Sequence, residues 1–205
     1  MPHLRFPSGE YVYWTRLDEH ERIKGELLPV VIDKMKNGCI ENPFKTCTMK
    51  TTITHNYKLL NREQLQKVLF EPLRKMFSEI DDSYIKNMDI YKTCVTTQWF
   101  NFYEKGDFQE VHSHLQNDNQ MQELIIDGKF CKEVFSAVYI LHDKSTENSL
   151  VFKGGDIVFD TSKQSDIQEG CVLLFPTSLK HEVRPVVVPG RITFAFNVAY
   201  HFSEM

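Results

Sequence analysis

The spacing of hydrophobic residues changes once along the chain, from a helical period in the first part to a strand-like period in the rest. Over residues 61–80, apolar side chains recur every three or four positions, which predicts an amphipathic helix. Asn61 should cap its first turn, with Gln64 three positions later. Pro72 should kink this helix or split it in two, and a second helix is expected over residues 19–36.

From residue 89 onward, short apolar runs separated by turn signals predict β-strands. Seven strands are expected, over residues 89–104, 108–114, 133–142, 156–160, 171–175, 180–185 and 191–202. Short strands at this spacing are typical of an all-β sandwich or barrel. We therefore expect a mainly β fold in which residues 1–88 form a helical support region of the same domain, and residues 89–205 form the β core. Residues 115–132 are polar, and we expect an irregular inserted loop there.

The last predicted strand alternates cleanly between two kinds of side chain. One face carries Ile192, Phe194, Phe196, Val198, Tyr200 and Phe202, and the other carries Arg191, Thr193, Ala195, Asn197, Ala199 and His201. The alternation leaves two interpretations open. The polar face could meet solvent, or it could line a polar cavity inside a barrel.

Composition narrows the class of protein. The chain has 205 residues and a net charge of -4, so binding to nucleic acid through a basic surface is not expected. No apolar run approaches the roughly 20 residues that span a bilayer, and no membrane association is expected. Five scattered cysteines without a CxxC pair predict reduced thiols in a cytoplasmic protein.

Histidines add candidate chemistry to the strand pattern. His112 and His114 lie two positions apart on one predicted strand, so both side chains should point the same way. His181 shares the less polar face of a later strand with Leu179 and Val183. Three inward-facing imidazoles can form a metal site, because neutral imidazole is the commonest metal ligand. A single histidine of this kind is more commonly structural than a metal ligand. For the three histidines together, the sequence supports a metal site and a structural role equally well.

Short motifs around these histidines resemble those of the 2-oxoglutarate/Fe(II) dioxygenases of the prolyl-hydroxylase type. Tyr103 to Gly106, followed by His112-Ser113-His114, resembles the YxxG…HxD strand of that family, and Gly154-Gly155-Asp156 resembles its GGE strand. Three further segments resemble its closing strands, namely Gly170 to Pro176, His181 to Val183 and Arg191 to Thr193. The chain is more similar still to phage and bacterial 2-oxoglutarate oxygenases that carry an HxH pair.

The resemblance implies a double-stranded β-helix, a cupin-like jelly roll, with the N-terminal helices packed on the larger sheet. It also implies an oxygenase that holds Fe(II) and couples oxidative decarboxylation of 2-oxoglutarate to hydroxylation of a substrate. His112 and His181 would be metal ligands. The sequence departs from the family because His114 stands where Asp or Glu is usual. His114 is the first choice for the third ligand, and Asp118 or Asp127 could supply a carboxylate instead.

Arg191 follows His181 by ten residues, where the family places a basic residue that holds the cosubstrate. A planar guanidinium can grip a carboxylate through two parallel hydrogen bonds, and Thr193 on the same face can add a hydroxyl donor. We therefore assign Arg191 and Thr193 to 2-oxoglutarate, with Tyr103 as a further hydrogen-bonding residue and Asn197 as an additional candidate. A surface salt bridge for Arg191 and a core position for Tyr103 are the alternatives.

Two other functions stay open. A cupin-type metalloenzyme can use three histidines without 2-oxoglutarate, although the glutamate expected after its HxH pair is absent here. A catalytically inactive jelly roll that serves as a binding module would fit the missing carboxylate. For the oxygenase, the prime substrate could be peptidyl proline, a free amino acid or another metabolite. The protein could act in the cytoplasm of a bacterium or of a phage host, and it could form a homodimer.

Overall fold

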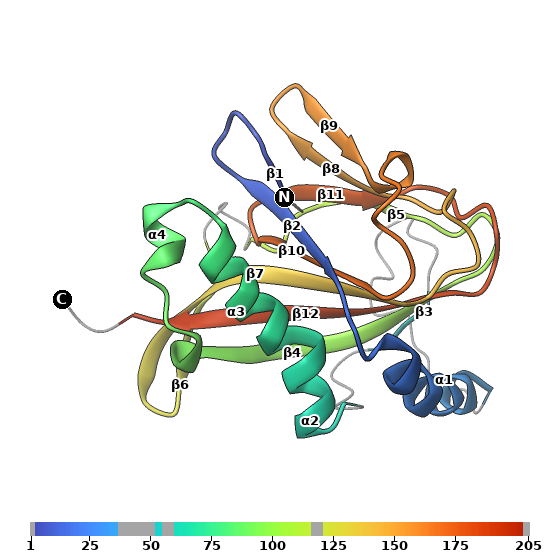
Figure 1. The fold of residues 1–205 in the computed structure, drawn as a ribbon, viewed down its shortest axis with the longest axis horizontal. Coiled ribbons are helices and arrows are strands. Elements are labelled where there is room, and N and C mark those ends of the chain that lie inside the picture. Colours follow the sequence, from blue (N-terminus) through green and yellow to red (C-terminus); the bar gives the residue numbers. More distant parts are fainter. Residues whose placement is uncertain (1–2, 37–51, 55–59, 116–120, 203–205) are drawn as a thin grey trace.

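The computed structural model describes residues 3–36, 52–54, 60–115 and 121–202, which form two antiparallel sheets with helices on one side (Figure 1). The strands of the larger sheet are β1 (His3–Arg5), β2 (Tyr11–Arg16), β3 (Thr52–Thr54), β4 (Thr93–Tyr103), β6 (Glu123–Ile126), β7 (Lys129–His142), β10 (Cys171–Pro176) and β12 (Arg191–His201). They run in the order β1-β2-β10-β7-β12-β4-β3, and β6 pairs with the start of β7.

The smaller sheet faces the larger one and completes a jelly roll, the mainly β fold expected from the sequence. Its strands are β5 (Gln109–His112), β8 (Leu150–Gly154), β9 (Ile157–Asp160) and β11 (Lys180–Val183), in the order β5-β11-β8-β9. All seven predicted strands are present, as β4, β5, β7, β9, β10, β11 and β12. The pattern missed β1, β2, β3, β6 and β8, three of which come from the region expected to be helical.

The helical region covers the outer face of the larger sheet (Figure 1). Its elements are α1 (His20–Lys36), α2 (Arg62–Leu65), the π-helical η1 (Gln66–Phe70), α3 (Glu71–Glu79) and α4 (Ser83–Lys86), while the short 3-10 turns η2 (Ile90–Lys92) and η3 (Thr161–Lys163) lie in the β core. The helix predicted over residues 61–80 is confirmed as a continuous run, capped by reciprocal hydrogen bonds between Asn61 and Gln64. The expected split at Pro72 is absent: Pro72 is the second residue of α3, directly after the π-helical turn, where the hydrogen-bond pattern of the helix has already shifted.

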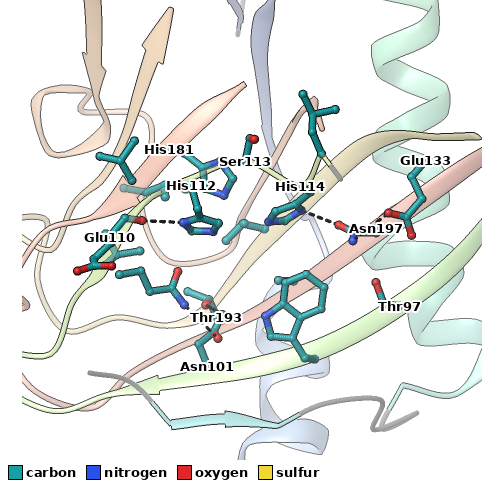
Figure 2. A pocket seen from close by; sticks show the side chains of 18 of the residues that line it. Thr97, Asn101, Glu110, His112, Ser113, His114, Glu133, His181, Thr193 and Asn197 are labelled. Carbon is teal, nitrogen blue, oxygen red and sulfur yellow. Dashed lines mark hydrogen bonds between the residues drawn. The ribbon is translucent and has the colours of Figure 1, made fainter. Parts of the chain in front are cut away.

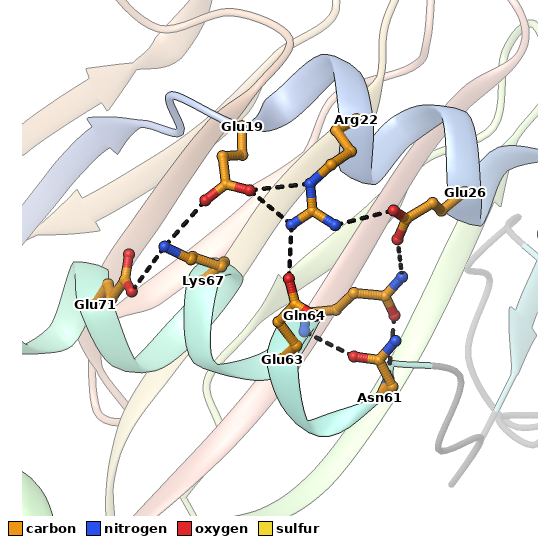
Figure 3. A network of polar contacts seen from close by, with 8 residues as sticks. All are labelled: Glu19, Arg22, Glu26, Asn61, Glu63, Gln64, Lys67 and Glu71. Atoms are coloured by element: carbon orange, nitrogen blue, oxygen red, sulfur yellow. Dashed lines mark hydrogen bonds and ion pairs between the residues drawn. The ribbon is translucent and has the colours of Figure 1, made fainter.

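A polar network joins α1 to the helical run that follows it (Figure 3). Arg22 donates to Glu26 at 2.9 Å and to Glu63 at 3.1 Å, and Nζ of Lys67 lies 2.9 Å from Glu19. These groups are partly exposed, so each pair contributes little to stability, and the network links the two helices at their surface.

Two separate apolar layers hold the fold together. The first lies between the helices and the larger sheet, and includes Ile23, Leu27, Leu69, Leu73, Met76, Tyr139, Leu174, Phe194 and Phe196. The second lies between the two sheets, and includes Val12, Trp14, Tyr103, Phe152, Leu173, Phe175 and Leu179. Alternating residues of β10 and β12 therefore serve opposite faces. Ile192 and Phe194 pack under the helices, which leaves Arg191 and Thr193 facing the space between the sheets.

The expectation of an irregular loop over residues 115–132 is wrong for its second half. Glu123–Ile126 forms β6, which pairs with β7 through a tight turn at Asp127 and Gly128. Both turn residues have positive φ, 51° and 74°, which suits a two-residue hairpin and makes Asp-Gly a signal for it. Asp118 lies outside the described residues.

Three of the five cysteines, Cys94, Cys131 and Cys171, are free thiols in the structure, whereas Cys39 and Cys47 lie outside the described residues. Among the helices that the structure describes, none combines the length and the apolar character needed to cross a membrane.

Candidate functional site

Two neighbouring strands of the smaller sheet bring three histidines together (Figure 2). His181 of β11 pairs directly with His112 of β5, so both side chains leave the sheet on the same side. His114 follows two residues later on the same face, and its backbone N–H donates to the carbonyl of Thr177 at 2.9 Å. The histidines named from the sequence therefore share one location.

The three imidazoles are close enough to share one ion. The ring centroids are 4.3 Å apart for His112 and His181, 5.1 Å for His114 and His181, and 5.5 Å for His112 and His114. One ring nitrogen from each residue lies within 4.8 Å of those of the other two. A divalent ion bound by imidazole nitrogens fits such a group.

Hydrogen bonds fix which ring nitrogen is available. Nδ1 of His112 donates to the carbonyl oxygen of Glu110 at 2.7 Å, and Nδ1 of His181 donates to that of Leu179 at 2.9 Å. A carbonyl oxygen can only accept, so each Nδ1 carries the proton and each Nε2 keeps its lone pair. Orientation of this kind is what metal-binding histidines require.

Burial keeps all three imidazoles neutral at pH 7. It lowers the pKa of His112, lowers that of His181 well below its ordinary value, and lowers the pKa of His114 to about 4. The neutral form is the one that binds metals.

Among the described residues, the third member of the group around His112 and His181 is His114, and no carboxylate belongs to the group. Asp127, the other described candidate for a third ligand, lies in the exposed turn between β6 and β7.

Arg191 lies at one end of the cavity that these histidines line, at the first residue of β12. Its side chain is only 2% exposed, and its Nε lies 3.2 Å from Oδ2 of Asp143. Nη1 is buried and has no hydrogen-bond partner among the residues that the structure describes. A buried guanidinium with an unmet donor is costly in a folded protein, and an anionic ligand would satisfy it.

Thr193 and Tyr103 line the same end of the cavity. Nδ2 of Asn101 donates to Oγ1 of Thr193 at 3.2 Å, which leaves the hydroxyl hydrogen of Thr193 free to donate elsewhere. The ring of Tyr103 lies across the strand pair from Arg191, with Cζ of Arg191 5.9 Å from the ring centroid.

Asn197 lies on the same face of β12 but six residues beyond Arg191, or roughly 20 Å of strand. Its Oδ1 is 2.7 Å from Nδ1 of His114. The structure therefore places Asn197 with the histidines rather than with Arg191.

Sequence reasoning missed two buried carboxylates of this region, Asp143 and Glu133. Both lie at the ends of the strand predicted over residues 133–142. A charged residue at the end of a strand normally indicates the start of a solvent-exposed turn. Only the pairing of β7 with β12 brings Asp143 beside Arg191 and Glu133 beside Asn197.

The histidines and Arg191 open onto one cavity of about 550 Å³ between the two sheets. Its walls come from β4, β7 and β12 of the larger sheet and from β5, β8 and β11 of the smaller one. Such a volume is typical of a small-molecule site.

A second group of metal-type side chains is His20, Glu21 and Glu169, of which His20 and Glu169 already have partners in the protein and Glu21 is exposed. The carboxylate of Glu169 accepts from Lys24 and from Nδ1 of His142, and it lies 3.3 Å from Nε2 of His20. This group therefore ties α1 to the sheet.

Solved structures share this fold at low sequence identity. A Pseudomonas putida prolyl-4-hydroxylase is 14% identical, with a TM-score of 0.56 over 94% of this chain and 92% of its own. A Trichoplax adhaerens prolyl hydroxylase in complex with a hypoxia-inducible factor peptide is 13% identical, with a TM-score of 0.60 over 91% and 82%. HygX from Streptomyces hygroscopicus, solved with nickel, 2-oxoglutarate and hygromycin B, is 12% identical, with a TM-score of 0.55 over 93% and 82%.

No protein-family model matches the sequence, and no curated protein matches it. At these identities the structural likeness establishes the architecture alone. The chain has the jelly-roll fold of prolyl hydroxylases and other 2-oxoglutarate oxygenases.

Proposed function

We propose that this protein is an Fe(II)- and 2-oxoglutarate-dependent oxygenase that hydroxylates its substrate. The observation that carries the proposal is one cavity with two complementary ends. Three neutral imidazoles lie at one end, and a buried guanidinium with an unmet donor lies at the other. 2-Oxoglutarate offers a chelating group that suits a metal ion and a distal carboxylate that suits the guanidinium, so its chemistry is complementary to both.

The residues fit the metal and the cosubstrate. His112, His114 and His181 would hold the ion through Nε2, while Arg191 and Thr193 would bind the distal carboxylate of 2-oxoglutarate. When bound, Fe(II) supplies the activation of O₂ that couples decarboxylation of 2-oxoglutarate to hydroxylation. Arg191 and Thr193 would orient the cosubstrate in the cavity between the two sheets.

The first test is 2-oxoglutarate titration of the metal-loaded protein, followed by measurement of succinate. Succinate formation that requires Fe(II), and that His181→Ala abolishes, would support the oxygenase. Metal binding without any affinity for 2-oxoglutarate would favour the cupin-type three-histidine metalloenzyme. A chain that binds neither would be an inactive jelly-roll binding module.

Peptidyl proline, free amino acids and other small metabolites are the candidate prime substrates. Two of the structural neighbours are prolyl hydroxylases, and a third is bound to an aminoglycoside, so the fold accepts different substrate classes. Stimulation of succinate formation by each class is the direct screen.

A further inference from the structure

Glu133 is a buried carboxylate in the wall of the cavity that the proposed chemistry does not use. It is 1% exposed and lies near the start of β7. No lysine or arginine of the described residues forms an ion pair with it; its carboxylate accepts from Oγ1 of Thr96 and, at 3.3 Å, from Nδ2 of Asn197. Burial raises the pKa of Glu133, and a buried carboxylate without a cation needs an explanation, because burial penalises its charge.

The contact with Glu133 determines which way the Asn197 amide points. A carboxylate can only accept, so the NH₂ group of Asn197 must face Glu133, and Oδ1 must face His114 (Figure 2). Oδ1 lies 2.7 Å from Nδ1 of His114, and an amide oxygen there requires a proton on Nδ1. The hydroxyl of Ser136 fits the same arrangement, since it lies 2.6 Å from Nδ1 and donates to Oδ1 at 3.2 Å.

Among the residues that the structure describes, none offers Nδ1 of His114 a backbone carbonyl acceptor of the kind that orients the other two histidines. Its Nδ1–H instead points into the chain of contacts His114–Asn197–Glu133–Thr96, which spans β12, β7 and β4. This chain leaves Nε2 of His114 with its lone pair toward His112 and His181.

We infer that Glu133 is a positioning residue for the metal centre, acting through Asn197 to hold His114 in its metal-binding tautomer and to place a negative charge behind it. This inference rests on the proposed function for the identity of the metal centre. The related family has a carboxylate ligand where this chain has the uncharged His114. Glu133 supplies that charge two hydrogen bonds away, through Asn197. A carboxylate behind a ligating histidine raises its basicity and its affinity for the metal.

The tautomer is tested first, without any metal. In metal-free protein labelled with ¹⁵N-histidine, NMR should show His114 as the Nδ1–H tautomer, with His112 and His181 as internal references. Glu133→Leu removes the acceptor that orients Asn197, so His114 should shift to a mixture of tautomers. An unchanged His114 in Glu133→Leu would overturn the positioning role.

The charge is tested by Co(II) titration of the metal-free protein. Glu133→Gln can keep its carbonyl toward Asn197 and so preserve the tautomer while removing the charge. Its dissociation constant for Co(II) should be about 10-fold higher than that of wild type, and that of Glu133→Leu up to about 100-fold higher. Asp160→Asn is the matched control, because Asp160 is also a buried carboxylate but lies outside the cavity; it should bind Co(II) as wild type does.

A rescue variant separates charge from packing. Glu133→Gln combined with Asn197→Asp moves the carboxylate directly against Nδ1 of His114, and affinity should return to within about 3-fold of wild type. Wild-type affinity in Glu133→Gln, or no recovery in the double variant, would overturn the charge role and leave the oxygenase proposal intact. Failure of the wild-type protein to bind Co(II) would instead overturn the proposed metal centre, while the tautomer measurement would still test the contact chain.

Discussion

Arg191, which lines the cavity, faces Asp143, which lies outside it, with Nε of the guanidinium 3.2 Å from Oδ2 of the carboxylate and both side chains almost fully buried. Asp143 follows β7 directly, and Arg191 begins β12, so the contact joins two paired strands. Oδ1 of Asp143 is held by Asn148 at 2.7 Å. Asp143 thereby pairs with the guanidinium by charge, while Nε and Nη1 have no hydrogen-bond partner among the described residues, and Nη1 is available to a ligand.

Replacing Arg191 should weaken cosubstrate binding far more than metal binding. Removing one partner of a charged pair in a partly dry pocket reduces the binding free energy by about 2–5 kcal/mol, or roughly 30- to 5,000-fold in affinity. Arg191→Ala should show this loss in a 2-oxoglutarate titration of the Mn(II)-loaded protein. Arg191→Lys should restore only part of it, because an ammonium cannot reproduce the two parallel hydrogen bonds. Unchanged affinity in Arg191→Ala would remove the cosubstrate assignment.

Asp143→Asn should make stability depend on the cosubstrate. The variant leaves the buried Arg191 without its counter-ion, at a cost of about 3–5 kcal/mol in the free energy of unfolding. Added Mn(II) and 2-oxoglutarate should then raise the melting temperature of Asp143→Asn more than that of wild type, because the ligand carboxylate replaces the lost charge. Asp160→Asn breaks a different partly buried pair, with Arg184, and should show no such excess. Equal shifts in all three proteins would contradict the prediction.

Thr193→Val tests the hydroxyl donor at constant shape. Asn101 already donates to Oγ1 of Thr193, so the hydroxyl hydrogen is available to a carboxylate in the cavity. Losing a hydrogen bond to a charged group costs about 1.5–3 kcal/mol, so 2-oxoglutarate affinity should fall about 10- to 150-fold. Thr193→Ser, which keeps the hydroxyl, should stay near wild type in the same titration. A normal affinity in Thr193→Val would show that Thr193 only packs.

Glu169 should make the protein sensitive to acid between pH 4.5 and 2. Burial raises the pKa of Glu169, but hydrogen bonds from Lys24, the N–H of Asp143, His20 and His142 outweigh burial and lower it to about 2. The stabilisation is therefore fully present above pH 4.5 and is lost as the pH falls through 2, because the unfolded state takes up the proton first. After allowance for partial exposure, the loss should be on the order of 2 kcal/mol.

Urea unfolding of metal-free protein at pH 6 and pH 3 measures this difference. Glu169→Gln should be less stable at pH 6 and should lose less between the two values. An identical pH dependence in Glu169→Gln and wild type would assign the acid sensitivity to other groups.

The amino-acid sequence by itself determined which face each side chain occupies within its own element. The period of two put His112 with His114 and Arg191 with Thr193, and the structure has both pairs on cavity-facing sides. The helix over residues 61–80 and its cap at Asn61 followed from local spacing as well. These features depend on contacts between residues close in the chain, so a local pattern contains them.

Only the tertiary structure decided which strands are neighbours. The register of β11 with β5 puts His181 opposite His112, and the register of β7 with β12 brings Asp143 to Arg191 and Glu133 to Asn197. Strand pairing joins residues that lie tens of positions apart in the chain. The alternation of side chains along one strand does not specify which other strand pairs with it. For the same reason β2, buried on both faces without alternation, was missed although it pairs with β10 in the larger sheet.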